Sequence, residues 1–488
     1  MKNRLLTINV VANIIQSLVS SALLFILYRY INKELGISEI GVWSIVIATV
    51  SASRLADFGI SSGITRFIAK ELAIGNIKKT VQVLETGFAT LLVSLPLILF
   101  IAWPILGLIL EGIVVGEYRT LALATLPIAL LSLYLALLAS IFQGALEGCQ
   151  KMLVRTFLTI GGQIIALLFA FLLVPKFGLE GLAWTQVIQA TFILVVGWSA
   201  LRIEFRSFPI FPSWDRKIFK EIINYGSKVQ AGMLAMMFFD PVTKALIARF
   251  GGLEIAGYFE LANQIVIKIR SVIISANQAI IPSVVNLHET ISDEVSHFYV
   301  KNIKLLTFFS FPIFSLLLIL SPLFSEFLLG KIEHDFLSIL YVITLSWFIN
   351  IFSGPAYFIN MATGNVGINA KVHIFIGFLN LILGIFLGLA YKESGVILAY
   401  STSLTAGSIL LIYYFHRDLK LAFNITIYPN VKIVLFSILI IIYFFGFKDS
   451  NNIKEILIMA ATSLIIYIVL ILKNPITYSI LKNLKNKK

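Results

Sequence analysis

Five basic side chains lie within long apolar stretches of the 488-residue chain: Arg54, Lys228, Lys244, Lys268 and Arg270. A charge near the centre of a bilayer costs about 3 to 17 kcal/mol, depending on how far its side chain reaches water. Such residues usually face a protein interior or an aqueous cavity. Arginine also offers a planar fork of donors that binds diphosphate or carboxylate oxygens in pairs and stays charged at physiological pH. The basic groups therefore predict a cavity for an anionic substrate group, a diphosphate or a carboxylate, with Arg54 and Arg270 as its candidate ligands.

Arg54 is followed one helical turn later by an acidic residue, which allows two interpretations. At about 100° per residue, Ser51, Arg54, Asp57, Ser61 and Thr65 share one face of a helix predicted over 40–66. In the first interpretation this face lines the cavity and Arg54 binds substrate. In the second, Arg54 and Asp57 neutralise each other and only hold helices together.

Other polar residues inside apolar stretches are candidates for the same cavity wall. Asp240 and Lys244 are four residues apart, and an i, i+4 ion pair explains them better than substrate contact. Lys228 lies near the cytoplasmic end of its stretch and fits a snorkelling side chain equally well. The cavity-lining candidates are Asn9, Asn13, Gln16, Asp57, Lys228, Asp240, Lys244, Glu260 and Asn263.

The composition is that of a membrane protein. Hydrophobic residues make up 59% of the chain, charged residues make up 13%, and the mean hydropathy is +0.94. The single cysteine, Cys149, predicts neither a disulfide framework nor a metal cluster. The net charge is +13, but the basic residues that produce it are scattered between the apolar stretches. We therefore expect no nucleic-acid partner. No HExxH, CxxC, GxSxG or phosphate-cradling Gly-rich motif is present, and we expect no enzyme.

The apolar stretches predict about 14 transmembrane helices, most of them reaching the ~20 residues needed to cross a bilayer. They cover 8–30, 40–66, 83–110, 120–145, 154–174, 179–200, 222–248, 256–281, 303–329, 336–360, 370–390, 395–415, 431–447 and 455–472. With both termini placed in the cytoplasm, most of the 38 Lys and Arg residues fall on the cytoplasmic side, as the positive-inside rule requires. Anionic inner-leaflet lipids are the expected contact of this basic excess.

The chain contains an internal repeat. An offset of 216 residues pairs Gly36 with Gly252 and Arg54 with Arg270, and further on it pairs 182–184 with 398–400. Each repeat holds six predicted spans, so the repeats have the same orientation, and a substrate site is expected between them. The predicted fold is an all-α polytopic membrane protein with two parallel six-helix repeats around a central cavity, plus two C-terminal helices. The predicted divisions are a first bundle at 1–201, a cytoplasmic linker at 202–220, a second bundle at 221–416, and the two extra helices with a basic tail at 417–488.

Several segments carry a resemblance to a known family. They are LGISEIGVW (35–43), LADFGI (55–60), RFIAKELAIGN (66–76), ALEGCQK (145–151) and GLEGLAW (178–184). With these segments the chain resembles the polysaccharide-transport flippases of the multidrug/oligosaccharidyl-lipid/polysaccharide exporter superfamily. The resemblance implies a cavity that opens alternately to each side of the bacterial inner membrane. It also implies a substrate, an oligosaccharide repeat unit linked to undecaprenyl diphosphate, that moves from the inner to the outer leaflet for O-antigen or capsule-type polysaccharide.

The same resemblance implies that Arg54 and Arg270 bind the diphosphate of the substrate. Lipid II flippases of this superfamily carry essential arginines in the second and eighth helices, which Arg54 and Arg270 match by helix and face. Their first-helix arginines are replaced here by Asn13 and Gln16, which argues against lipid II itself. No cofactor is expected. A coupling Na⁺ or H⁺ is left open, with Asp57, Asp240 and Glu260 as candidates, and a polysaccharide polymerase is a candidate partner.

Three alternatives compete with this prediction. A multidrug exporter of the same fold would need carboxylates in its cavity for organic cations, whereas the predicted cavity is basic. A lipid II flippase is disfavoured by the first helix. A membrane polysaccharide polymerase or ligase should carry acid–base residues on a large outer loop, and the outer loops are short.

Overall fold

The protein is all-α. The computed structural model describes residues 2–205, 213–237, 239–278, 292–363, 365–419, 421, 431–446 and 453–474, without the side chains of 2–14, 228–229, 231–237, 275–278, 292–294, 366 and 446. Within these ranges the chain forms 14 α-helices and one 3-10 helix, η1, and no β-strand. The predicted all-α class is thereby confirmed.

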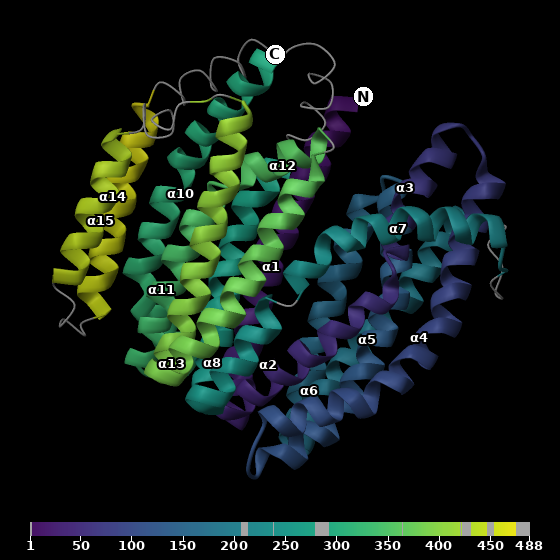
Figure 1. The fold of residues 1–488 in the computed structure, drawn as a ribbon, viewed down its shortest axis with the longest axis horizontal. Helices are drawn as coiled ribbons and strands as arrows, with labels where there is room; N and C mark the ends of the chain where they lie inside the picture. The colour runs from purple at the N-terminus through teal and green to yellow at the C-terminus, as the bar shows by residue number, and fades with distance from the viewer. Residues whose placement is uncertain are drawn as a thin grey trace. The chain divides into compact units, whose positions relative to one another are not determined.

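Figure 1 shows the helices in their order along the chain. They are α1 (Lys2–Leu35), α2 (Ile37–Ser51), η1 (Ala52–Asp57), α3 (Ile60–Ala73), α4 (Ile77–Ile113), α5 (Tyr118–Gly148), α6 (Met152–Glu204), α7 (Arg216–Met237), α8 (Phe239–Gln278), α10 (Ser292–Leu329), α11 (His334–Ile351), α12 (Gly354–Ala362), α13 (Val366–Asp418), α14 (Val431–Gly446) and α15 (Ile453–Leu472).

The chain divides into two compact units. The first unit holds Met1–Glu260 with Leu381–Val396, and the second holds Leu261–Asn380 with Ile397–Lys488. In the first unit α5 is central and packs against α2, α3, α4 and α6. In the second unit α10 packs against α11, α12, α14 and α15 (Figure 1). The division into bundles at 1–201 and 221–416, with a linker at 202–220, concerns the sequence repeat and stays a prediction.

In the part of the chain that the structure describes, eight helices are long and apolar enough to cross a membrane, and two of these are long enough to cross it twice. α6 and α13 each contain 53 residues, or about 80 Å of helix at 1.5 Å per residue, against about 30 Å of hydrocarbon. Each is bent near its middle, at Gly178 in α6 and at Tyr391–Lys392 in α13. The protein is thus a multi-pass membrane protein.

The internal repeat is visible in the backbone. Gly36 (φ 89, ψ 169) precedes α2, and its predicted mate Gly252 (φ 82, ψ 179) breaks α8 with nearly the same dihedral angles. Gly178 (φ 55, ψ −133) and Lys392 (φ 51, ψ −136) form a second matched pair. Positive φ strains any residue with a Cβ, so its recurrence at matching places indicates that the repeats share one backbone plan.

The two matched pairs also correct the sequence alignment. Gly36 and Gly252 are 216 residues apart, whereas Gly178 and Lys392 are 214 apart. The predicted pairing of 182–184 with 398–400 is therefore out of structural register by two residues. The offset changes from 216 to 214 between these two pairs. In this interval the first repeat has one continuous helix, α5, whereas the second repeat has two helices, α11 and α12, separated at Phe352–Ser353. A gapless offset could not show this interruption.

The predicted continuous helix over 40–66 is wrong. α2 ends at Ser51, η1 follows, and Phe58 (φ 49) and Gly59 (φ 72) adopt left-handed conformations before α3 begins. The break has a packing cause, because the backbone of Gly59 lies directly against the backbone of Gly226 on α7 and leaves no room for a Cβ on either residue. Arg54 and Asp57 therefore lie on a 3-10 segment, outside the single α-helical face that the sequence predicted.

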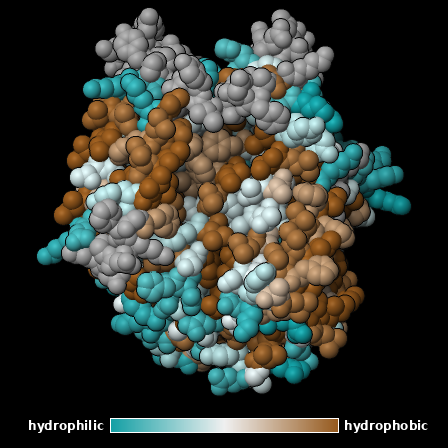
Figure 2. Space-filling model, turned by 60° about the vertical axis from the view of Figure 1, so that its left-hand side comes forward, coloured by the Kyte–Doolittle hydropathy of each residue, from teal (hydrophilic) through white to brown (hydrophobic). Residues whose placement is uncertain are grey.

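Large apolar side chains are exposed along the spans. On α4 strongly exposed apolar side chains recur at helical spacing, namely Val93, Leu97, Phe100, Ile101, Ile105 and Leu108. Hydrophobic residues occupy much of the face shown in Figure 2, while hydrophilic residues gather toward its lower end. Apolar surface of this extent needs lipid as its solvent.

Candidate functional site

Arg270 lies in the second half of α8 and contacts side chains of α11. Its Nη2 donates a hydrogen bond to Asn350 Oδ1 over 3.0 Å. Its guanidinium carbon lies 4.5 Å from the centre of the Trp347 ring, a cation–π contact. An amide oxygen and a ring face therefore orient the fork without neutralising it.

A chain of neutral hydrogen bonds holds these two supporting side chains. Asn350 Nδ2 donates to Ser408 Oγ over 2.9 Å. Trp347 Nε1 donates to the Tyr400 hydroxyl over 3.0 Å, and that hydroxyl donates to Asn263 Oδ1 over 3.3 Å. Asn263, a candidate for the cavity wall, is only 1% exposed and serves as an acceptor for Tyr400. The network fixes Arg270 in advance of any ligand, which lowers the entropic cost of binding.

The charge of Arg270 is not balanced within the described part of the chain. None of the ion pairs found there involves Arg270, and its buried Nε has no hydrogen-bond partner among the described residues. Leaving a buried charge or donor unpaired is costly. An incoming anion would satisfy both the charge and the donor.

Lys244, on the first half of the same helix, is fully paired. Its Nζ lies 2.8 Å from Asp240 Oδ2 and 2.7 Å from Glu260 Oε2, and its side chain is 7% exposed. The Tyr28 hydroxyl of α1 donates to Glu260 Oε1 over 2.9 Å. The predicted i, i+4 pair of Asp240 and Lys244 is confirmed. We call Tyr28, Asp240, Lys244 and Glu260 the Lys244 cluster.

The turn at Gly252 makes the Lys244 cluster possible. Lys244 and Glu260 are sixteen residues apart, which would be about 24 Å along a straight helix. The non-helical backbone of Gly252 lets the two limbs of α8 fold toward each other until the side chains meet. Because two carboxylates already surround Lys244, the cluster is a structural ion-pair network and a poor site for another anion.

Arg54 is exposed and forms no ion pair with Asp57 among the described contacts. Asp57 Oδ1 instead accepts from the backbone N–H and the hydroxyl of Ser61, at 3.4 and 3.1 Å. The Ser61 hydroxyl is in turn 2.6 Å from the Ser140 hydroxyl of α5. The ion pair on which the purely structural interpretation of Arg54 depends is thus not formed, and substrate binding by Arg54 stays a prediction.

The remaining candidates divide into those with a described contact and those without. Gln16 Oε1 accepts from Thr156 Oγ1 of α6 over 3.1 Å. Asn9 and Asn13 lie on α1 and Lys228 lies on α7, but their side chains fall outside the described residues.

Sequence reasoning missed the side chains that support Arg270. Trp347 and Asn350 are polar groups three residues apart in the apolar stretch 336–360, and that spacing on one helix face was the available signal. Their contact with Arg270 spans about eighty residues of chain and cannot be read from local spacing.

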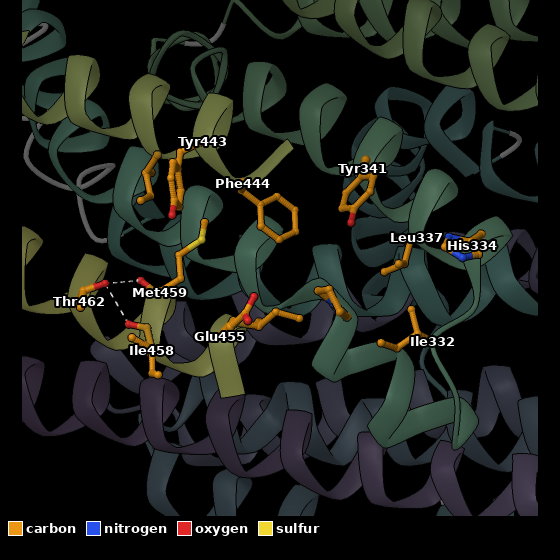
Figure 3. A pocket seen from close by; sticks show the side chains of 13 residues that line it. Ile332, His334, Leu337, Tyr341, Tyr443, Phe444, Glu455, Ile458, Met459 and Thr462 are labelled. Atoms are coloured by element: carbon orange, nitrogen blue, oxygen red, sulfur yellow. Dashed lines mark hydrogen bonds between the residues drawn. The ribbon is translucent and has the colours of Figure 1, made fainter. Parts of the chain in front are cut away.

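A separate cavity of about 450 Å³ lies between α10, α11, α14 and α15 in the second unit. His334, Tyr341, Tyr443, Glu455 and Thr462 supply its polar groups, and Leu337, Phe444 and Met459 are among its apolar lining (Figure 3). None of the predicted site residues lines it. No cluster of three or more potential metal ligands occurs among the described residues.

Comparison with known proteins places the chain in a family. Residues 6–288, more than half of the chain, match the family model described as polysaccharide biosynthesis protein. The chain belongs to this polysaccharide biosynthesis protein family. A search of curated proteins found no match.

Solved structures show which fold this family member adopts. An inward-facing multidrug resistance MATE family transporter of the MOP superfamily aligns with a TM-score of 0.74 at 14% identity, over 83% of this chain and 98% of the other. The lipid II flippase MurJ, in an inward closed conformation, aligns with 0.70 at 16% identity, over 96% and 98%. A MOP superfamily transporter from Pyrococcus furiosus aligns with 0.59 at 14% identity, over 84% and 95%. At these identities the likeness establishes a MOP-superfamily transporter fold and nothing more.

Proposed function

We propose that this family member is a flippase that moves oligosaccharide repeat units linked to undecaprenyl diphosphate from the inner to the outer leaflet of the bacterial inner membrane. The observation that carries the proposal is the unbalanced charge of Arg270, which neutral partners hold in place. A lipid-linked sugar diphosphate offers the one feature such a site lacks, a multivalent anion with several acceptor oxygens. Family membership supports a role in polysaccharide biosynthesis.

The proposed mechanism is alternating access. The diphosphate enters a cavity open to the cytoplasm and binds Arg54 and Arg270, the sugars stay in water, and the polyprenyl tail stays in lipid. Binding favours the occluded state only if the ligand has a higher affinity for that state. This difference in affinity comes from charge neutralisation. Closing the site removes water from around the arginines, so that an unpaired charge costs more there and a bound anion stabilises it more.

The driving ion is also a proposal, with Na⁺ or H⁺ as the candidates. Asp240 and Glu260 already hold the ammonium of Lys244, which a coupling ion would have to displace. Asp57 accepts hydrogen bonds only from Ser61 among the described residues and is the carboxylate that we favour for this role.

The proposed orientation of the protein in the membrane is based on the distribution of its basic residues. Both termini are proposed to be cytoplasmic, and the basic loops are proposed to contact anionic lipids of the inner leaflet. Cysteine labelling in intact cells tests this orientation. Positions near Lys79 and Lys217 should be protected from a membrane-impermeant reagent, and positions near Tyr118 and Lys331 should react. The opposite pattern would overturn the proposed direction of transport. A polysaccharide polymerase remains a proposed partner.

Reconstitution in liposomes tests the function directly. The probe is a fluorescent disaccharide on a prenyl diphosphate, with the matching prenyl monophosphate and a dephosphorylated glycolipid for comparison. We expect protein-dependent movement of the diphosphate alone, with altered sugars partly tolerated. Equal movement of the dephosphorylated lipid would contradict the proposal, and transport of cationic dyes in its place would support the multidrug alternative.

A further inference from the structure

Two further donor side chains lie near Arg270 without acceptors of their own. His373 of α13 and Tyr357 of α12 are both within electrostatic range of the guanidinium. His373 Nε2 is buried and has no hydrogen-bond partner, and the Tyr357 hydroxyl makes no hydrogen bond among the described residues. The two rings meet at a centroid distance of 5.7 Å and an angle of 64°.

Buried hydrogen bonds join α12 and α13, the helices that carry these two residues. Asn369 Nδ2 donates to the backbone oxygen of Tyr357 over 3.0 Å, and Asn360 Nδ2 donates to Asn369 Oδ1 over 3.0 Å. Asn360 and Asn369 are 4% and 2% exposed, so this link between α12 and α13 is buried. The backbone of Tyr357 is therefore held to α13, the helix that carries His373.

We propose that Arg270, His373 and Tyr357 form a phosphate-binding pocket, each supplying an N–H or O–H donor to the oxygens of one phosphate. The proposal rests on the proposed function and extends its diphosphate site to two residues outside α8. Arg270 Nε, His373 Nε2 and the Tyr357 hydroxyl come from three helices and have no acceptor among the described residues, and no described carboxylate pairs with the arginine. Such donors match a group that is rich in acceptors and poor in donors. Phosphate meets this requirement better than carboxylate because it has more acceptor oxygens.

Binding measurements on the purified full-length protein test the pocket. The probes are farnesyl diphosphate, farnesyl monophosphate, inorganic diphosphate and farnesol, titrated in detergent solution. We expect His373→Phe to weaken farnesyl diphosphate binding by about tenfold or more, the range for losing a hydrogen bond to a charged group. Tyr357→Phe should weaken it several-fold. His373→Gln, which keeps an N–H donor near the position of Nε2, should retain most of the affinity.

The chain provides a matched control. Tyr299 and His416 form a second tyrosine–histidine pair in the same unit, with the hydroxyl 2.9 Å from Nε2. Tyr299→Phe removes a hydroxyl of the same kind and should leave binding unchanged. Size-exclusion chromatography and circular dichroism confirm that each variant is folded, and Tyr357→Phe keeps the test decisive if His373→Phe does not fold.

The outcomes separate this inference from the proposed function. Wild-type affinity in both His373→Phe and Tyr357→Phe, with binding lost in Arg270→Ala, would overturn the pocket and leave the function standing. Wild-type affinity in Arg270→Ala would overturn the diphosphate site on which both depend. Equal binding of inorganic and farnesyl diphosphate, both weakened by His373→Phe, would support the pocket and show that it recognises the phosphates alone.

Discussion

Lys244 and Arg270 both lie on α8, but the first is paired with carboxylates and the second is not. Lys244 is buried between the carboxylates of Asp240 and Glu260, at 2.8 and 2.7 Å. Arg270 has an amide oxygen, an aromatic face and no paired carboxylate among the described residues. Both arrangements hold a cation inside a membrane protein, but only the first is electrostatically complete.

The difference separates a structural charge from a binding charge. A cation with its counter-ions in place stabilises the fold and has little to gain from a ligand. A cation that is held in place without a counter-ion destabilises the free protein, and binding of an anion removes this destabilisation. This trade of stability for binding is common at functional sites. The four predictions below test that distinction, beginning with the largest expected effect.

Arg270→Ala should abolish transport of the lipid-linked diphosphate while leaving the protein inserted and folded, because it removes an unbalanced charge and breaks no ion pair. Arg270→Lys should keep partial activity, since it retains the charge but loses the fork. Liposome transport and size-exclusion profiles measure the two effects. A strong loss of folded Arg270→Ala protein would place this residue with Lys244 as a structural charge.

Arg54→Ala should likewise stop transport, and adding Asp57→Ala should not restore it, because the two side chains form no ion pair in the described contacts. Surface polysaccharide and protein level are measured together for the single and double variants. Asp57→Ala alone is measured beside them, because it removes both the Ser61 hydrogen bonds and the carboxylate proposed to bind the coupling ion, and the double variant is compared with it. Wild-type export by the double variant would show that Arg54 only neutralises Asp57.

Lys244→Ala should lower the free energy of unfolding by about 3 to 5 kcal/mol, the usual cost of leaving a buried charge, here the carboxylate of Glu260, without its partner. Thermal unfolding in detergent and the amount of folded protein report the effect. A triple variant with Lys244→Met, Asp240→Asn and Glu260→Gln should recover much of the stability, since no buried charge is left unpaired. Normal stability with lost transport in Lys244→Ala would instead assign Lys244 to the substrate site.

Asp215, outside the spans, should show the smallest effect. The backbone N–H groups of Ile218 and Lys217 hold the pKa of its carboxyl below the ordinary value at the start of α7. A lowered pKa in the folded state stabilises the protein at neutral pH, and this contribution is lost as the pH falls through that pKa. Asp215→Ala should therefore unfold at a slightly lower temperature at pH 7, and the difference should shrink in acid. A difference that grew on acidification would contradict the capping role.

Several features followed from the sequence because their causes are local. Apolar stretches of sufficient length must become helices in lipid, where every backbone hydrogen bond has to be made internally. The four-residue spacing of Asp240 and Lys244 predicted their ion pair, since such residues meet on any regular helix. Gly36 and Gly252 were paired by the repeat, and both have backbone angles that favour glycine.

Other features depended on residues far apart in the chain, and only the tertiary structure decided them. The helix predicted through Arg54 is broken because Gly59 meets Gly226, a contact that no pattern within 40–66 can reveal. Glu260, predicted to line the cavity, pairs with Lys244 because α8 turns at Gly252. Asn350 and Trp347 reach Arg270 from another helix. Periodicity finds where a charge lies along a helix, whereas the balancing of that charge depends on neighbours that packing alone brings into contact.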